Sequence, residues 1–234
     1  LRLSKARHIV LSYNINIKKN LYLKTELYHQ FLSDIPVATD TNYTFNSDDI
    51  YELVNSSLVS DGVGENYGVE FTLEQSFMKD YYFLVTSSLF NSKYRSSNGK
   101  WYNSKYNLRY VNNLVAGREF RIRDKNIFGL NTKFIWSGGK RDTPLDVDST
   151  LIYETDIYQQ DKRNTTQYKE YLRFDLGISY RINRLKVSHV ISLDIQNVTN
   201  RKNIADQNYD TETGKIEYHY LSGLIPILNY RIEF

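Results

Sequence analysis

Histidines and clustered carboxylates are the residues of this sequence that could do chemistry, as zinc ligands, calcium ligands or proton-transfer groups. No two of the histidines have the spacing of a zinc site. They are His8, His29, His189 and His219. The clustered acids form two stretches, Asp142, Asp146 and Asp148 in one and Asp206, Asp210 and Glu212 in the other. Neither stretch follows the twelve-residue calcium-loop pattern, so we expect solvated loop acids and no metal.

A nucleophilic site is also not expected. Ser188, His189 and Asp194 are close in the sequence, but in an extended strand His189 points away from the other two. We expect His189 to be a structural residue near a strand end. The glycine-rich stretch "GVGENYG" at 62–68 leads into a strand and not a helix, so it is not a phosphate-binding loop. The sequence therefore predicts neither an enzyme nor a cofactor.

Composition narrows the function classes further. The 234 residues include 21 Tyr and no Cys, which excludes a disulfide scaffold and a thiolate metal site. The net charge is only +3, and no stretch is dense in Lys and Arg, so nucleic acid is not the expected partner. No run of 18 apolar residues suggests a membrane-spanning helix. The chain opens on "LRLSKARHIVLSYN", which has no signal-peptide pattern and already has the character of a strand, as in a piece of a longer protein.

The elements that position these residues are β-strands, because apolar and polar residues alternate almost throughout. "YLRFDLGISYRI" at 171–182 shows the pattern, with Leu176 and Ile178 on one side and Asp175 and Ser179 on the other. Nine strands are expected, near 6–16, 21–32, 66–77, 81–93, 106–120, 128–137, 170–182, 187–197 and 217–234. Alternation is poor near 81–93 and 106–120, so the facing of these two strands stays open.

Three features favour a transmembrane barrel over a soluble β-sandwich, which also alternates. The strands have roughly the ten residues that a tilted barrel strand needs to cross a bilayer, whereas globular strands average about five or six. Short connections at 17–20, 78–80, 124–127 and 183–186 alternate with long ones near 33–65, 94–105, 138–169 and 198–216. Aromatic residues gather at strand ends, Phe77, Phe128, Tyr180 and Tyr230 by the short turns and Phe31, Tyr67 and Trp136 by the long connections. Short turns at one end with long loops at the other, and aromatic residues at both strand ends, are typical of outer-membrane barrels.

Four segments resemble the C-terminal barrel of TonB-dependent outer-membrane receptors of the Bacteroidetes. They are "GENYGVEFTLEQ" at 64–75, "FIWSGGKRDTPLD" at 134–146, "ISLDIQNVTNRKN" at 191–203 and "GLIPILNYRIEF" at 223–234. The resemblance implies that residues 1–234 are the C-terminal portion of a 22-strand barrel, with the earlier strands, the plug domain and the TonB box upstream of Leu1. It implies location in the cell outer membrane. The partners implied are membrane lipid and lipopolysaccharide, the barrel-assembly machinery, and the TonB complex through the N-terminal region.

Charged residues opposite the apolar stripe are the candidates for the barrel interior. They are Lys24, Glu26, Glu70, Glu74, Lys133, Arg173, Asp175, Arg181, Asp194, Arg231 and Glu233. Two roles are possible for this face. It contacts the plug or a solute, or it is a solvated wall of paired charges.

The last strand ends on Leu228, Tyr230, Ile232 and Phe234 at alternate positions. In the family that this chain resembles, such an ending is similar to the signal read by the barrel-assembly machinery. The alternative is a strand that only closes the barrel and anchors it at the interface with an aromatic residue.

The expected function is ligand-binding, energy-coupled uptake across the outer membrane. Long connections rich in Tyr and Asn would bind the ligand, at 39–57, 95–107 and 151–168. The ligand is open among siderophore, glycan, cobalamin and peptide. A passive porin or a surface adhesin is the alternative, and a barrel-embedded hydrolase is disfavoured by the missing catalytic group.

Overall fold

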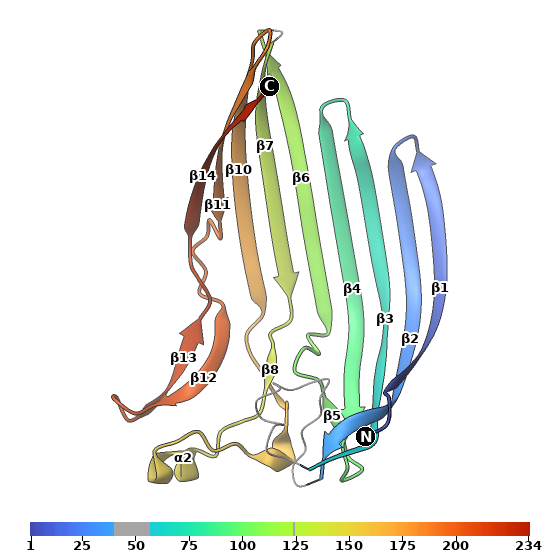
Figure 1. Ribbon diagram of the computed structural model, residues 1–234, viewed down its shortest axis with the longest axis vertical. Coiled ribbons are helices and arrows are strands. Elements are labelled where there is room, and N and C mark those ends of the chain that lie inside the picture. Colours follow the sequence, from blue (N-terminus) through green and yellow to red (C-terminus); the bar gives the residue numbers. More distant parts are fainter. Residues whose placement is uncertain (40–56, 124) are drawn as a thin grey trace.

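Nine long antiparallel strands lie side by side in the computed structural model, which describes residues 1–39, 57–123 and 125–234 (Figure 1). In spatial order they are β1 (Lys5–Lys18), β2 (Leu21–Ala38), β3 (Leu58–Met78), β4 (Tyr81–Arg95), β6 (Tyr110–Ile122), β7 (Asn126–Ser137), β10 (Tyr171–Asn183), β11 (Ser188–Gln196) and β14 (Ile225–Glu233). Each strand pairs with its neighbour in the order of the chain, so the sheet is an up-and-down meander. The nine long strands that the sequence predicts are confirmed, and the short β5 (Trp101–Asn103), paired with β4, is a tenth strand of this sheet.

Alternation along the strands becomes two distinct faces of the sheet, because paired residues of adjacent strands share a face. One register row runs through Leu130, Ile178, Leu193 and Leu228, each opposite the next. We call this side the apolar face. Three residues further along the strands, on the opposite side, Lys133 lies opposite Asp175. We call that side the polar face.

The register also shows which residues of β4 and β6 lie on the apolar face, which the sequence leaves open. Val85 of β4 lies opposite Leu73 of β3 and Leu114 of β6. Leu114 in turn lies opposite Phe134 of β7. Val85 and Leu114 therefore belong to the apolar face, although Asn112 and Arg118 on the same side of β6 interrupt its alternation.

Short turns and long connections lie at opposite ends of the sheet, as Figure 1 shows with the turns at the top. Three of the four turns contain non-glycine residues with positive φ, namely Asn20, the pair Lys79 and Asp80, and Arg123. Left-handed residues of this kind give a hairpin the twist of its strands. Asp124, within one turn, is outside the described residues.

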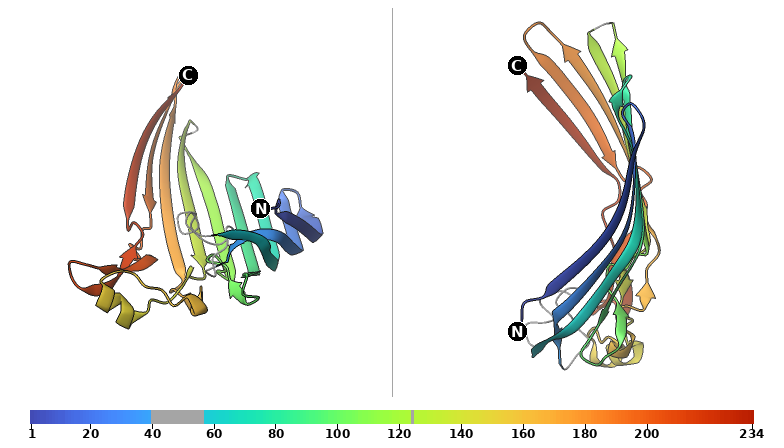
Figure 2. Two further views of the ribbon diagram at one scale, coloured as in Figure 1. Left: turned by 60° about the horizontal axis from the view of Figure 1, so that its bottom comes forward. Right: turned by 90° about the vertical axis from the view of Figure 1, so that its right-hand side faces the viewer.

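The sheet is curved and open (Figure 2). Among the described residues, β1 pairs only with β2 and β14 only with β11, so one backbone edge of each strand has no partner. Every residue of β1 is exposed. No helix in the described part of the chain is long and apolar enough to cross a membrane.

Several expected boundaries are wrong. The strand expected at 217–234 is two strands, β13 (Lys215–Tyr220) and β14, because β13 pairs with β12 (Ile204–Asp210) in a separate hairpin. The linker between β13 and β14 contains Gly223, and the Asn200 side chain accepts a hydrogen bond from the Leu224 amide at 3.0 Å. The strand expected from 106 begins at Tyr110, and β2 and β3 extend past the expected limits into the connection at 33–65.

The connections other than residues 40–56 fold into a layer of their own, which we call the connection layer. It contains β5 (Trp101–Asn103), β8 (Arg141–Asp142), α2 (Val147–Tyr153), η1 (Gln160–Lys162), β9 (Thr166–Gln167) and the β12–β13 hairpin. Asp146 caps α2 by accepting a hydrogen bond from the Ser149 amide at 3.2 Å. The buried apolar side chains of the described residues lie at this end of the sheet, and they are Ile35, Val37, Ala38, Tyr94, Tyr102, Leu145 and Tyr168.

Candidate functional site

The charged residues that the sequence singles out all lie on the polar face, as the register shows. The structure divides them into three groups, one on β2 and β3, one on β7, β10 and β11, and one beside the short turns on β10 and β14. The three groups are Lys24, Glu26, Glu70 and Glu74; Lys133, Arg173, Asp175 and Asp194; and Arg181, Arg231 and Glu233.

The middle group is centred on the Asp175 carboxylate, which is 16% exposed. Its Oδ1 accepts hydrogen bonds from Arg173 Nε at 2.7 Å and from the Asn197 amide at 2.8 Å. Lys133 lies directly opposite Asp175 on β7. A shallow hollow of about 390 Å³ on this part of the sheet is lined by Lys133, Arg173, Asp175 and Asp194, among others.

Glycines allow side chains to lie flat over the backbone of the polar face. A Cβ on Gly177 would meet Asp194 Oδ1 at 2.5 Å. A Cβ on Gly117 would meet both Tyr82 and Asn131 at 2.4 Å, and the Tyr82 hydroxyl donates to Asn131 Oδ1 at 3.0 Å. Polar groups therefore reach across neighbouring strands along the middle of the sheet.

Each of the two outer groups also contains ion pairs between its own residues. Lys24 Nζ lies 2.6 Å from Glu26 Oε2, and Ser12 Oγ donates to Glu26 Oε1 at 3.1 Å. Near the turns, Arg181 and Arg231 both form ion pairs with Glu233, the second at 2.8 Å. A face of this kind can hold water, a polar solute or a polar protein surface.

In the connection layer, polar side chains are buried where remote segments meet. The Asn107 amide, which is fully buried, donates to Asn91 Oδ1 at 2.7 Å and to Asn103 Oδ1 at 2.9 Å. Arg141 is 6% exposed and donates from Nε to the Asn107 carbonyl at 3.0 Å. Burial lowers the pKa of Arg141, and the nearby charge of Arg109 acts in the same direction.

Tyr168 connects β9 with β8 in this layer. Its hydroxyl donates to Asp142 Oδ2. Burial raises the pKa of Tyr168 far above its usual range, and the hydrogen bond to the Asp142 carboxylate raises it further. The phenol is therefore a neutral, structural donor.

The clustered acids also have local roles. Asp142 accepts from Tyr168, and Asp146 caps α2. Asp206 lies 3.1 Å from His219 across the β12–β13 hairpin, and Asp210 accepts from the Glu212 amide at 2.8 Å. Among the described residues, no three of the His, Cys, Asp and Glu side chains are grouped as metal ligands.

The remaining histidines lie on the sheet and are not grouped with a nucleophile. His189 Nδ1 is 2.7 Å from the Tyr230 hydroxyl on the apolar face. Ser188 Oγ instead donates to Asn183 Oδ1 at 2.9 Å. His29 lies 2.9 Å from Glu65, and His8 lies 2.8 Å from Gln30.

No family model and no curated protein matches the chain. The sheet resembles part of an import receptor. The ferric-catecholate import receptor Fiu from E. coli K12, in a closed form, aligns with a TM-score of 0.61 and 13% sequence identity. The match covers 97% of this chain and 27% of that one, so the chain spans about a quarter of the receptor's length.

This likeness concerns the fold. The expected fold class is confirmed, since the chain is an antiparallel all-β sheet that corresponds to part of a β-barrel receptor. At 13% identity it transfers no ligand and no residue role.

Some residues of structural consequence are missed by sequence reasoning. Asn107, Arg141, Asn164 and Tyr168 hold the connection layer together; Asn164 Nδ2 donates to the Asn103 carbonyl at 2.9 Å. The one sequence signal is the abundance of Asn and Tyr in the long connections, which does not say which side chains become buried. Of the expected ligand-side segments, residues 40–56 lie outside the described residues.

The expected assembly signal lies on β14. Leu228, Tyr230 and Ile232 are on the apolar face, opposite Leu193, Ile191 and His189 of β11. Phe234 follows the strand and is fully exposed.

Proposed function

We propose that this chain is the C-terminal part of the barrel wall of a TonB-dependent, energy-coupled uptake receptor in the cell outer membrane. The observation that carries the proposal is the contrast between the two faces of nine long strands, one predominantly apolar and one charged. Large exposed apolar surfaces mark contact with a membrane or a partner. In a membrane barrel, lipid would cover the apolar face and water inside the barrel would solvate the charges of the polar face.

The open sheet supports the idea of a larger barrel. The free backbone edges of β1 and β14 would pair with earlier strands, because an exposed edge strand is otherwise a site of aggregation. In this proposal the plug domain lies inside the barrel and contacts the polar face. The TonB complex acts through a region upstream, and lipopolysaccharide surrounds the wall near the connection layer.

The edge of β14 also suits recognition during assembly. Its free backbone edge can accept a strand of another protein by β-augmentation, while alternate side chains provide specificity. We assign this role to Leu228, Tyr230, Ile232 and Phe234, with the barrel-assembly machinery as the partner.

A passive channel or an adhesin on the same barrel remains the alternative, because the internally paired charges of the polar face would suit an unplugged aqueous pore as well. Energy dependence separates the two functions. A receptor stops accumulating ligand when the proton-motive force is removed, whereas a pore continues to equilibrate it.

The test is uptake by cells that carry or lack the full-length protein. The probes are an iron-loaded catecholate, cobalamin, an oligosaccharide and a peptide, each radiolabelled, with and without a protonophore. Protein-dependent uptake that the protonophore abolishes supports the proposal. Protein-dependent uptake that persists with the protonophore supports the porin, and surface adhesion without uptake of any probe supports the adhesin.

Topology is tested independently at the tip of the β4–β5 hairpin, where Asn98 Nδ2 donates to the Tyr102 hydroxyl at 2.7 Å. An epitope inserted after Asn98 should be labelled on intact cells, because long connections face outward in this proposal. Labelling only after the membrane is permeabilised would reverse the orientation.

A further inference from the structure

The short turns concentrate positive charge. Segments 17–20, 78–81, 119–126 and 183–187 contain eight Lys and Arg residues and only three acids, Asp80, Glu119 and Asp124. The excess of five exceeds the net charge of +3 of the whole chain. The eight cations are all exposed, and they are Lys18, Lys19, Lys79, Arg121, Arg123, Lys125, Arg184 and Lys186.

Most of these cations have no carboxylate partner among the residues that the structure describes. Arg121 lies 3.9 Å from Asp80, the outer limit of an ion pair. The other seven form no ion pair with a carboxylate of the described residues. On the polar face, by contrast, ion pairs join Lys24 with Glu26, Arg173 with Asp175, and Arg181 and Arg231 with Glu233. The long connections near 138–169 and 198–216 mix Lys and Arg with acids. The turn end is therefore the part of the described surface that is suited to an external anion.

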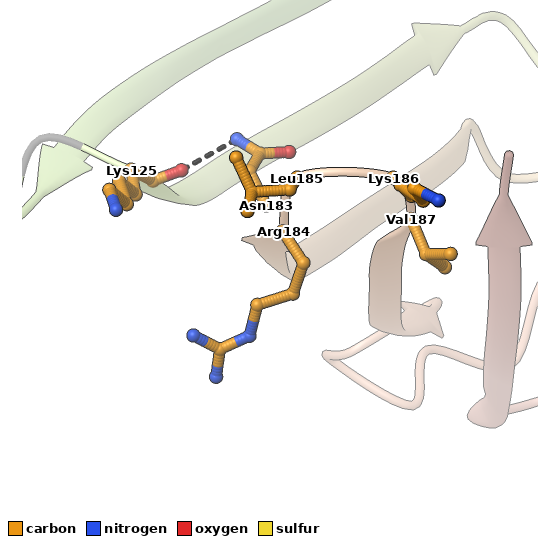
Figure 3. Close-up of a pocket in the computed structure, with 6 residues that line it drawn as sticks. All are labelled: Lys125, Asn183, Arg184, Leu185, Lys186 and Val187. Atoms are coloured by element: carbon orange, nitrogen blue, oxygen red, sulfur yellow. Dashed lines mark hydrogen bonds between the residues drawn. The ribbon is translucent and has the colours of Figure 1, made fainter.

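One apolar side chain lies among these cations. Leu185 forms the tip of the β10–β11 turn between Arg184 and Lys186, and its relative exposure is 106%. These residues, with Lys125 of the adjacent turn, line an open hollow of about 760 Å³ (Figure 3). Asn183 Nδ2 donates to the Lys125 carbonyl at 2.6 Å, which holds the two turns together.

The turns also directly follow the apolar face. Its last full row contains Phe120, Phe128, Tyr180, Ile191 and Tyr230, each opposite the next. Aromatic rows of this kind lie at the boundary between acyl chains and headgroups. If the apolar face contacts lipid, as the proposed function requires, the turn cations lie at the level of the phosphates.

We propose that the short-turn end binds anionic phospholipid headgroups of the adjacent leaflet, with the turn cations on the phosphates and Leu185, at the tip between Arg184 and Lys186, within the headgroup layer. Cations spread over four turns match a planar array of charges better than one acidic protein site. Exposed apolar tips among Lys and Arg are typical of surfaces that lie in such an interface. This inference rests on the proposed membrane location.

The test uses the full-length protein reconstituted in mixed vesicles of phosphatidylcholine and phosphatidylglycerol. Spin-labelled versions of the two lipids report the share of each lipid in contact with the protein. The wild type should prefer phosphatidylglycerol by roughly fivefold, as expected for about one effective cation per lipid site. The preference should vanish in about 1 M salt, where the screening length is about 3 Å.

Matched variants assign the effect to the turns. The first variant removes four turn cations and should bind the two lipids nearly equally; it combines Lys18→Gln, Lys19→Gln, Arg184→Gln and Lys186→Gln. The control variant removes the same charge from exposed sites at the other end and should keep the preference for phosphatidylglycerol; it combines Lys100→Gln, Lys162→Gln, Lys169→Gln and Lys215→Gln. No preference in the wild type, or equal loss in both variants, would overturn the inference.

A probe at residue 185 distinguishes lipid from a soluble acidic partner. Because this chain contains no Cys, Leu185→Cys can carry an environment-sensitive fluorophore, provided that other cysteines of the full-length protein are absent or replaced. Its emission should shift to the blue in phosphatidylglycerol-containing vesicles. Water-like emission in every vesicle would exclude contact with lipid. Failure of the wild type to insert into any vesicle would contradict the proposed function itself, and this inference with it.

Discussion

The strands of the sheet and the connection layer are stabilised in different ways. Along the strands, side chains such as Leu193 and Asp175 face outward from a single sheet, and few residues there are buried. In the connection layer, Leu145, Tyr168 and Asn107 are buried. The layer thus has a core of its own, whereas the sheet must obtain one from its surroundings.

This difference explains the distribution of polar groups. On an exposed face, ion pairs contribute little, so the charges can serve contact with water or another protein. In the connection layer, a buried amide without a partner would cost free energy. The Asn107 amide accordingly donates to Asn91 and Asn103, and the Asn164 amide to the Asn103 carbonyl. On the sheet, the effect of a substitution on stability should therefore depend on the medium that the side chain faces. In the connection layer, it should depend on the contacts that the side chain loses.

The largest expected effect is on the apolar face. If the apolar face contacts lipid, as proposed, Leu193→Arg should lower the free energy of unfolding from a bilayer by about 2–4 kcal/mol, because a charge placed in the hydrocarbon layer loses hydration. Ser179→Arg on the polar face, opposite Gly129, should change it by only about 0.5 kcal/mol. Urea titration of the full-length protein in vesicles measures both, and equal effects would show that the face assignment is wrong.

A second prediction concerns the buried amide of the layer. Asn107→Ala removes the donor to Asn91 and Asn103, and should destabilise the layer by about 1–3 kcal/mol. Limited proteolysis should then cleave the connections faster while the sheet stays protected. The exposed Asn14→Ala in β1 is the control. Unchanged cleavage of the connections in Asn107→Ala would mean that the layer does not depend on this network.

Tyr168 provides a pH-dependent test. Its pKa is raised in the folded state, so the neutral phenol stabilises the layer fully below the unfolded pKa of about 10, and the contribution is lost as pH rises through the folded pKa. Tyr168→Phe should cost about 1–2 kcal/mol at neutral pH. Above about pH 10, the variant should lose less hydrogen-exchange protection than the wild type, because it has no phenol to ionise. Hydrogen exchange of β8 and β9 reports the change, and an identical alkaline profile in both proteins would contradict it.

The smallest effects concern turn backbones. Gly99 has a φ of 76° with no atom within 4 Å of a built Cβ, so Gly99→Ala should cost about 1 kcal/mol from backbone strain alone. Lys79→Gly, at a φ of 53° in a short turn, should stabilise by a few tenths to about 1 kcal/mol. Thermal or urea unfolding compares the two variants. A gain in the first or a loss in the second would show that side-chain contacts, not φ, dominate these turns.

Much of the sheet could be predicted from the sequence. Period-two alternation in 171–182 and 188–196 places Leu176 and Leu193 on one face and Asp175 and Asp194 on the other, as the register shows. The interrupted pattern of β6 could not be assigned, because Asn112 and Arg118 occupy apolar-face positions. The hairpin β12–β13 was missed because "KIEYHY" and "ILNYRI" alternate alike, although they pair with different strands.

By itself, the sequence determines which residues can share a face and where the chain turns, since both follow from local periodicity and backbone preference. Only the tertiary structure decides which loops meet. Asn107 and Arg141, or Asp142 and Tyr168, are joined across tens of residues. Those contacts depend on the closure of long connections, whose entropy cost is offset by specific burial and hydrogen bonding that no local pattern encodes.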